Sequence, residues 1–195
     1  MGHVESPSSV AGAGRVACRF QKALSREVAQ MMTRTAKLLL VAGIALLYTL
    51  IVFNNLTDFD ANYEFVRHVV SMDTTGAGNH SMWRAMSSPA IFLVFYWSII
   101  AWEIVTTFLL WSGVVVLLRA LRLPAFEFNT VKRVPILALT LSLIMWLVAF
   151  LAVGGEWFLM WLSHNWNGQE EAFRNFIMVA FVLLILLQPD TDTQS

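Results

Sequence analysis

The chain has 195 residues, of which 57% are hydrophobic and 13% are charged, and its 13 basic and 13 acidic side chains give a formal net charge of zero. Ordinary soluble domains carry about 25% charged residues, so this composition excludes a soluble domain and predicts an integral membrane protein. Without a basic surplus to neutralise phosphates, nucleic-acid binding is not expected. A single cysteine, Cys18, excludes a disulfide framework and a thiolate metal cluster.

The first 31 residues are predicted to form a basic cytoplasmic extension before the membrane domain. Residues 2–14 are small and polar and are expected to be disordered. Residues 15–34 carry repeated basic side chains, which favours an amphipathic helix on a membrane surface. Met31 and Met32 come directly before the first apolar segment, so translation from one of them is an alternative start.

Four apolar segments follow, each close to the 20 or so residues that a helix needs to cross the hydrocarbon core. They predict an all-α, four-helix transmembrane bundle over residues 32–190, followed by a cytoplasmic tail at 191–195. Ser88 and Pro89 are typical of a helix start before the second segment, and Pro189 is a stop after the fourth. The predicted spans are residues 36–53, 90–118, 134–153 and 173–187.

The two connections on the outer side are expected to contain short interfacial helices. Apolar side chains repeat at helical spacing over residues 60–72, with Asp60 as the expected cap. The second connection, residues 154–174, is rich in tryptophan, which prefers the headgroup level of a membrane. It is predicted to form a helix that caps the bundle and places Trp157 and Trp161 on one face.

Basic residues indicate the orientation of the chain. Ten of the 13 lie before the first span or between the second and third, whereas the other two connections hold only Arg67, Arg84 and Arg174. By the positive-inside rule, both termini are expected in the cytoplasm. The sequence therefore predicts a multi-pass protein of the cell inner membrane that contacts the lipid bilayer.

Glu103 is the only charged residue of the second span and lies near its middle. An ionisable group at that depth is costly and is a functional hypothesis by default. Tyr96, Thr106 and Thr107 share its helical face, at spacings of seven, three and four residues. Two interpretations are open: a protonated glutamate that hydrogen-bonds two helices together, or a proton or ion site. The expected hydroxyl partners on other spans are Tyr48, Thr49, Thr140 and Ser142.

The second outer connection is also a candidate binding surface, because a carboxylate under an aromatic cluster suits a headgroup, a quinone or a cationic ligand. The alternative is a structural kink with a carboxylate at its rim. The residues concerned are Glu156, Trp157, Trp161, His164 and Trp166. The histidines show no metal-ligand spacing and none lies in a span, so neither a metal nor a cofactor is predicted.

Several motifs resemble a bacterial family of predicted small integral membrane proteins, catalogued as domain of unknown function 2165. The resemblance covers about Met32 to Asp190. It implies a four-span inner-membrane protein and no particular activity. The motifs are FNNLTD at 53–58, FVRHV at 65–69, SMDTT at 71–75, VGGEWFLMW at 153–161, WNGQ at 166–169 and LQPD at 187–190.

Three functions are compatible with these patterns. The preferred one is a non-enzymatic accessory or scaffold component of a larger membrane complex or homo-oligomer, with the tryptophan-rich connection as the contact surface. The second is an oligomeric small transporter or a proton or ion pathway that uses Glu103. The third is a quinone- or redox-linked membrane subunit with its site at the outer rim.

Overall fold

The structure, a computed structural model, describes the backbone of residues 7–76 and 78–192. Within these ranges it consists of helices and loops without a strand, and 81% of the chain is helical. The all-α prediction is therefore confirmed. The predictions for residues 1–6 and for the tail at 193–195 lie outside the described residues.

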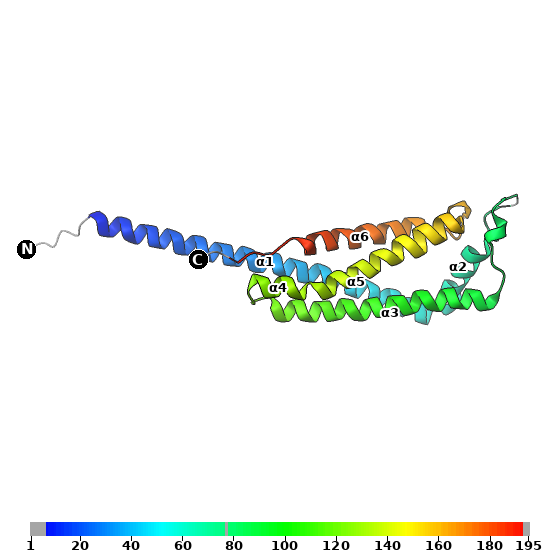
Figure 1. Ribbon diagram of the computed structural model, residues 1–195, viewed down its shortest axis with the longest axis horizontal. Helices are drawn as coiled ribbons and strands as arrows, with labels where there is room; N and C mark the ends of the chain where they lie inside the picture. The colour runs from blue at the N-terminus through cyan, green and yellow to red at the C-terminus, as the bar shows by residue number, and fades with distance from the viewer. Residues whose placement is uncertain (1–6, 77, 193–195) are drawn as a thin grey trace, which may run out of the picture.

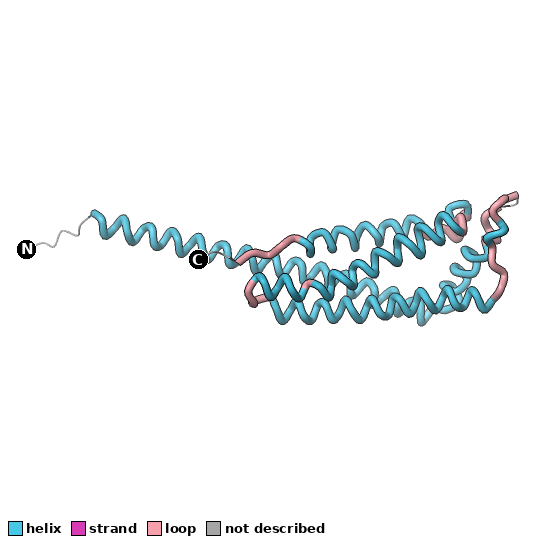
Figure 2. Tube along the Cα trace, viewed as in Figure 1, coloured by secondary structure: helices cyan, strands magenta, loops and turns pink. Residues whose placement is uncertain are grey.

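The described chain forms six α-helices and three shorter or irregular helices, joined by loops at both ends of the molecule (Figures 1 and 2). Of the irregular ones, η2 is a π-helix that continues α5 directly, and η1 and η3 are single 3-10 turns. The bounds are α1 Pro7–Thr57, α2 Phe59–Ser71, η1 Met82–Arg84, α3 Pro89–Ala120, α4 Ala125–Val131, α5 Arg133–Ile144, η2 Met145–Trp157, η3 Met160–Leu162 and α6 Gln169–Leu187.

The long helices run lengthwise beside one another, and α1 extends well beyond the others at its N-terminal side (Figure 1). Helix α1 contacts α3 and α6, and α5 contacts the same two helices. One end of the molecule carries α2 and the loop that follows it; we call this the α2 end. The opposite end carries α4 and the C-terminal segment, and we call it the α4 end.

Three helical segments are long and apolar enough to cross a membrane: residues 24–57, 89–120 and 125–157. They contain the first three predicted spans. Helix α6 has 19 residues but carries Glu170, Glu171 and Arg174 near its start, so its apolar stretch is shorter. The structure thus supports an integral membrane protein with three candidate spans.

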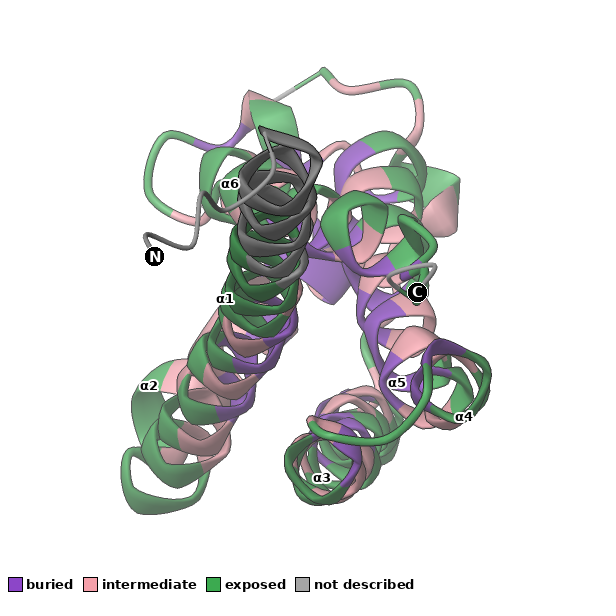
Figure 3. Ribbon diagram, turned by 90° about the vertical axis from the view of Figure 1, so that its left-hand side faces the viewer, coloured by how far each residue is buried: buried purple, intermediate pink, exposed green. Residues whose placement is uncertain are grey.

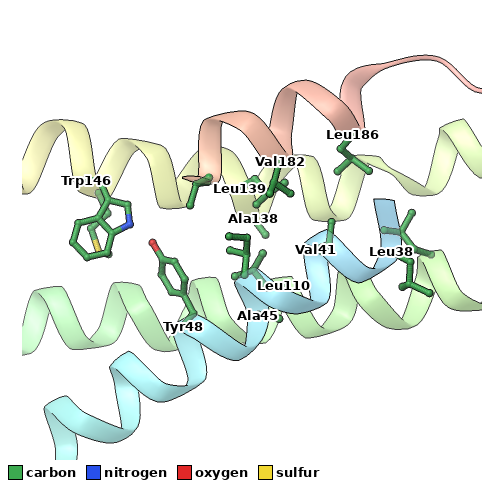
Figure 4. Packing of buried hydrophobic residues seen from close by; sticks show 14 of the residues in the cluster. Leu38, Val41, Ala45, Tyr48, Leu110, Ala138, Leu139, Trp146, Val182 and Leu186 are labelled. Atoms are coloured by element: carbon green, nitrogen blue, oxygen red, sulfur yellow. The ribbon is translucent and has the colours of Figure 1, made fainter. Parts of the chain in front are cut away.

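The core lies between the long helices, whose buried faces turn toward one another (Figure 3). Tyr48 from α1 and Leu110 from α3 are fully buried there, as are Leu139 from α5 and Val179 from α6. Figure 4 shows these helices interdigitating around Val41, Ala45 and Ala138. The alanines at positions 45 and 138 are small enough to allow close helix approach, and small residues are typical of helix contacts in membranes.

The first helix differs from its prediction at both ends. Residues 7–31, expected as a separate extension with disorder up to residue 14, continue the first span as one α-helix. The helix also runs past Phe53 to Thr57, since no proline interrupts it and Asn54–Thr57 keep helical geometry. The next helix, α2, begins at Phe59 with Asp58 at the N-cap position, so the assignment of the cap to Asp60 is wrong.

The second outer connection also differs from its prediction. No interfacial α-helix forms over its tryptophans; instead η2 continues through Gly154 and Gly155 to Trp157. The chain then reverses at Leu159, which has a positive φ of 54°, and makes the single turn η3. Trp157 and Trp161 therefore do not share a helical face. Gly155 is packed against the amide end of the Gln169 side chain, which a Cβ atom would displace.

Candidate functional site

Glu103 lies on the buried face of α3 and is 2% exposed. Its Oε2 accepts a hydrogen bond from Nδ2 of Asn55 at 2.6 Å. Asn55 belongs to the last turns of α1, a segment expected to be a loop, so the continuation of that helix brings the amide to the carboxylate. The partner of Glu103 is thus an amide rather than one of the four expected hydroxyl groups.

The polar residues predicted beside Glu103 have different environments. The hydroxyl of Tyr96 is close to it and donates to the backbone oxygen of Asn55 at 2.6 Å. Thr107 donates to the backbone oxygen of Glu103 at 2.7 Å, within the helix. Thr106 is fully buried, and its Oγ1 has no hydrogen-bond partner among the described residues. Tyr96 and Glu103 therefore belong to one site. The two threonines follow Glu103 along α3 and are not part of that site.

A cavity of about 400 Å³ adjoins Glu103 and reaches toward the α2 end. It lies between α1, α2, α3, η2 and the start of α6. Exposed Glu171 and Asn167 line the part nearest the α2 end, and Glu103 lines the deeper part. The lining side chains that carry polar atoms are Asn55, Asn62, Tyr96, Glu103, Trp146, Asn167, Glu171 and Asn175.

The charged side chains that line this cavity are all acidic. Its lining includes two carboxylates, Glu103 and Glu171, and among the described lining residues there is no lysine, arginine or histidine. A buried carboxylate without a cationic partner is costly when ionised. The cavity is therefore suited to a positively charged occupant or a proton. Aromatic rings of Phe65, Tyr96 and Phe150 also line it, and such rings attract cations over their faces.

The cavity ends against a packed layer of side chains on the side of the α4 end. Tyr48 and Ser142 are joined there by a hydrogen bond of 2.5 Å and are both fully buried. The hydroxyl of Tyr48 points toward the ring of Trp146, which lines the cavity (Figure 4). Leu110 is fully buried beyond them. This arrangement closes the cavity on the side of the α4 end.

The residues predicted as an outer binding surface do not converge on one site. Trp157 makes an edge contact with Trp83, at 5.9 Å between ring centroids. Trp166 instead stacks on His68, at 4.5 Å. Trp161 is half exposed. Glu156 and His164 are also exposed, and neither lines the Glu103 cavity.

Arg84 connects the two outer connections at the α2 end. Its guanidinium lies 5.2 Å from the ring centroid of Trp83 and 5.1 Å from that of Trp157. Its Nη1 donates to the backbone oxygens of Glu156 and Trp157, at 3.4 and 3.3 Å. These contacts hold the end of η2 against the loop before α3. The role they support for Trp157 is structural.

A buried ionic cluster at the α4 end is the second concentration of charge. Asp190 accepts hydrogen bonds from Nζ of Lys37, at 2.7 Å, and from Nζ of Lys132. Arg34 lies 3.9 Å from the same carboxylate and donates to the backbone oxygens of Leu121 and Leu123. All four ionic side chains are less than 5% exposed. The cluster therefore ties α1, the α3–α4 turn, α5 and the C-terminal segment together.

The ionisation of Asp190 is governed by two opposing effects. Burial alone would raise the pKa of the Asp190 carboxyl, but the hydrogen bonds and charges of Lys132 and Lys37 outweigh burial and hold that pKa below its ordinary value. The negative charge of Asp190 thus compensates the buried cations at the α4 end. The cluster combines residues 34, 37, 132 and 190, and only folding brings them together.

Asn55, Asn62 and Asn175 were missed as site residues, because isolated asparagines near helix ends are ordinary capping and surface residues. Asp190 was missed because it follows the last helix and belongs to no motif with a known mechanism. One signal was present for both Asn55 and Asp190: they stand within the FNNLTD and LQPD motifs quoted for the family resemblance.

Comparison with known proteins gives one match. Residues 33–189 match the family described as predicted small integral membrane protein (DUF2165). No curated protein and no solved structure matches the chain significantly. The matched range includes the whole lining of the Glu103 cavity and three of the four members of the ionic cluster, and it ends one residue before Asp190.

Proposed function

Because the chain belongs to the family of predicted small integral membrane proteins, we propose that it is a four-span, four-helix protein of the bacterial inner membrane. Helix α6 is the proposed fourth span: its 19 residues extend over about 28 Å as an α-helix, so the whole helix, with its charged first turns at one end, is about as long as the hydrocarbon core is thick. Its buried residues Val179, Val182 and Leu186 pack in the same core as the other three. The asymmetry of the basic residues supports cytoplasmic termini.

We further propose that the protein is a non-enzymatic binding protein that holds a cationic group at Glu103, entering from the outer side. The observation that carries this proposal is the cavity of about 400 Å³ lined by two carboxylates and by no basic residue among those described. Asn55 gives Glu103 one hydrogen bond, which leaves its negative charge for the occupant to balance. Aromatic rings beside the carboxylate fit an ammonium group.

Tetramethylammonium binding to the protein in phosphatidylcholine nanodiscs tests this proposal by isothermal titration calorimetry. Glu103→Gln is expected to weaken binding about ten- to hundredfold, since the attraction between two unit charges about 4 Å apart ranges from about 1 kcal/mol in bulk water to about 4 kcal/mol near a protein surface. Glu156→Gln is the matched control, because it removes an exposed carboxylate outside the cavity. Equal binding by wild type and Glu103→Gln, or no saturable binding to either, contradicts the proposal.

A second proposed function is that of an accessory subunit of a larger membrane complex or homo-oligomer. Leu24, Val28 and Met32 are 52%, 53% and 67% exposed and follow one face of α1 at a spacing of four residues. They precede the proposed first span at residues 36–53, in the N-terminal part of the helix that extends beyond the others (Figure 1), so the lipid core does not cover them in the proposed topology. An apolar stripe in that position supports contact with another helix.

The accessory role is tested by purification in mild detergent and measurement of the mass and composition of the complex. The double change of Leu24→Ser with Val28→Ser is expected to release the stoichiometric partner, whether another protein or a second copy. Ala29→Ser, an exposed position off the stripe, should leave the complex intact. A monomer of unchanged mass in all three samples contradicts this role.

A further inference from the structure

An apolar cleft of about 300 Å³ lies beside the Glu103 cavity, between α2, α3 and η2. Its lining is apolar apart from the hydroxyl of Ser98 and the indole N–H of Trp102, and includes Phe95, Ala149 and Val153. The two helices that form most of it belong to candidate membrane spans. Exposed Ser98 and Val148 stand among its lining residues, so the cleft opens sideways toward the hydrocarbon layer.

The cleft and the Glu103 cavity lie side by side and have lining residues in common. Four residues line both of them: Phe65, Val66, Ile99 and Phe150. An apolar compartment open to lipid thus adjoins a polar compartment that contains carboxylates. A ligand that fills both compartments has a cationic end and an apolar end.

We infer that the ligand of the Glu103 cavity is a cationic amphiphile of the bilayer, an ammonium group on an alkyl chain, with the chain in the cleft between α3 and η2. The inference rests on the proposed binding of a cation at Glu103 and adds the chemical class of the ligand. The carboxylates Glu103 and Glu171 select for positive charge, and disfavour a phosphate-bearing headgroup.

The irregular geometry of η2 contributes to the cleft. Met145, Ala149 and Val153 repeat at intervals of four residues along this π-helix and all line the cleft. Gly154 lines it as well and presents no side chain to the space. Segments of π-helix occur frequently at functional sites, and here the segment forms one wall of a ligand-sized space.

The test is photolabelling of the full chain in phosphatidylcholine nanodiscs with dodecyltrimethylammonium that carries a diazirine at the chain end. Label is expected on peptides from residues 91–102 and 144–158, and an excess of unlabelled dodecyltrimethylammonium should reduce it about tenfold by mass action. Dodecyl maltoside, which has the same chain and no charge, should not compete.

One variant and its control test whether the alkyl chain of the probe lies in the cleft. Ala149→Phe fills the cleft and should reduce the competed label about tenfold while tetramethylammonium binding changes less than about twofold, which also shows that the variant is folded. Leu147→Phe is the matched control, because Leu147 is 48% exposed on the same helix and does not line the cleft; it should label as the wild type does.

The outcomes separate the two proposals. Label spread over all lipid-facing helices, or label unaffected by Ala149→Phe, overturns the inference even if tetramethylammonium binding still depends on Glu103. Loss of both the label and tetramethylammonium binding in Glu103→Gln supports both proposals. Saturable label in the cleft that persists in Glu103→Gln overturns the inference of a cationic ligand. In that case the alkyl chain of the probe binds in the cleft without any contribution from its ammonium group.

Discussion

Two buried carboxylates of this protein have opposite surroundings. Asp190 is held by Lys37 and Lys132, with Arg34 close by, so its negative charge is compensated by the fold itself. Glu103 has one amide as its hydrogen-bond partner and faces a cavity. The difference separates a structural carboxylate from one whose charge is available to a ligand.

Asp190→Asn is expected to reduce the free energy of unfolding by about 3–5 kcal/mol, because it leaves buried cations without their counter-charge. The measurement is denaturant-induced unfolding in a mild detergent. Glu127→Gln, an exposed carboxylate of α4 at the same end, is the control and should change stability by less than about 0.5 kcal/mol. Equal effects of the two variants would show that the cluster does not stabilise the fold.

Acid should weaken the same cluster. The pKa of Asp190 is lowered in the folded state, so its contribution to stability is fully present above the unfolded pKa of about 3.9 and is lost as the pH falls through the folded pKa. The stability difference between wild type and Asp190→Asn is therefore expected to be constant from neutral pH to about pH 5 and to shrink below pH 4. A difference that grows on acidification contradicts this sign.

At the residue scale, a residue that breaks a pattern can be recognised from the sequence alone. Glu103 stands out as the one charge in an apolar span, and Tyr96 follows from helical spacing. Asn55 does not stand out, because its importance depends on where α1 ends and on how α1 lies against α3. Such contacts between distant parts of the chain are set by packing and leave no local signal.

At the scale of elements, close approach between α3 and α5 depends on one glycine. A Cβ atom on Gly113 would lie 2.7 Å from Cβ and 3.0 Å from Cα of Pro135, too close for either helix to stay in place. Pro135 stands in the first turn of α5, where its missing N–H group costs little, and its ring packs against α3.

Gly113→Ala is expected to destabilise the protein by about 1–3 kcal/mol through overpacking, although alanine favours helix more than glycine does. The matched control is Gly43→Ala in α1, where a Cβ atom would meet nothing within 4 Å. This control should stabilise the helix by about 0.5–1 kcal/mol. Thermal unfolding of both variants in detergent is the measurement, and a Gly113→Ala protein as stable as wild type would contradict the close approach.

The sequence predicted where helices lie better than where they end. Apolar stretches of about 20 residues are strong signals, whereas the continuation of α1 to Thr57 and of η2 to Trp157 depends on contacts with neighbouring elements. The kink expected in the second outer connection does not fall at Gly154 and Gly155, which remain within η2. The chain reverses at Leu159 instead.

At the scale of the whole molecule, the ionic cluster and the Glu103 cavity occupy opposite ends. The α4 end is closed by charge pairs and buried side chains, whereas the α2 end contains the cavity and the loops that border it. In the proposed topology, a ligand reaches Glu103 from the outer side or from the lipid. In that topology, neither route starts in the cytoplasm.

Labelling of single cysteines tests this topology in a Cys18→Ser background. His80→Cys at the α2 end should react with a membrane-impermeant maleimide in intact cells. Thr191→Cys at the α4 end should react only after permeabilisation, because α6 returns the chain to the cytoplasm. Both positions are exposed in the fold. Reaction of both cysteines in intact cells would show that α6 does not cross the membrane.

The ionic cluster also has a consequence for the time course of membrane insertion. Ribosomes make Arg34, Lys37 and Lys132 before Asp190, since synthesis runs from the N-terminus. In the proposed topology, these cations have no Asp190 to neutralise them while the first three spans enter the membrane, and they can act as orientation signals in the cytoplasm. Once the last helix has followed, Asp190 neutralises them. In that topology, the same three side chains direct insertion early and hold the finished protein together afterwards.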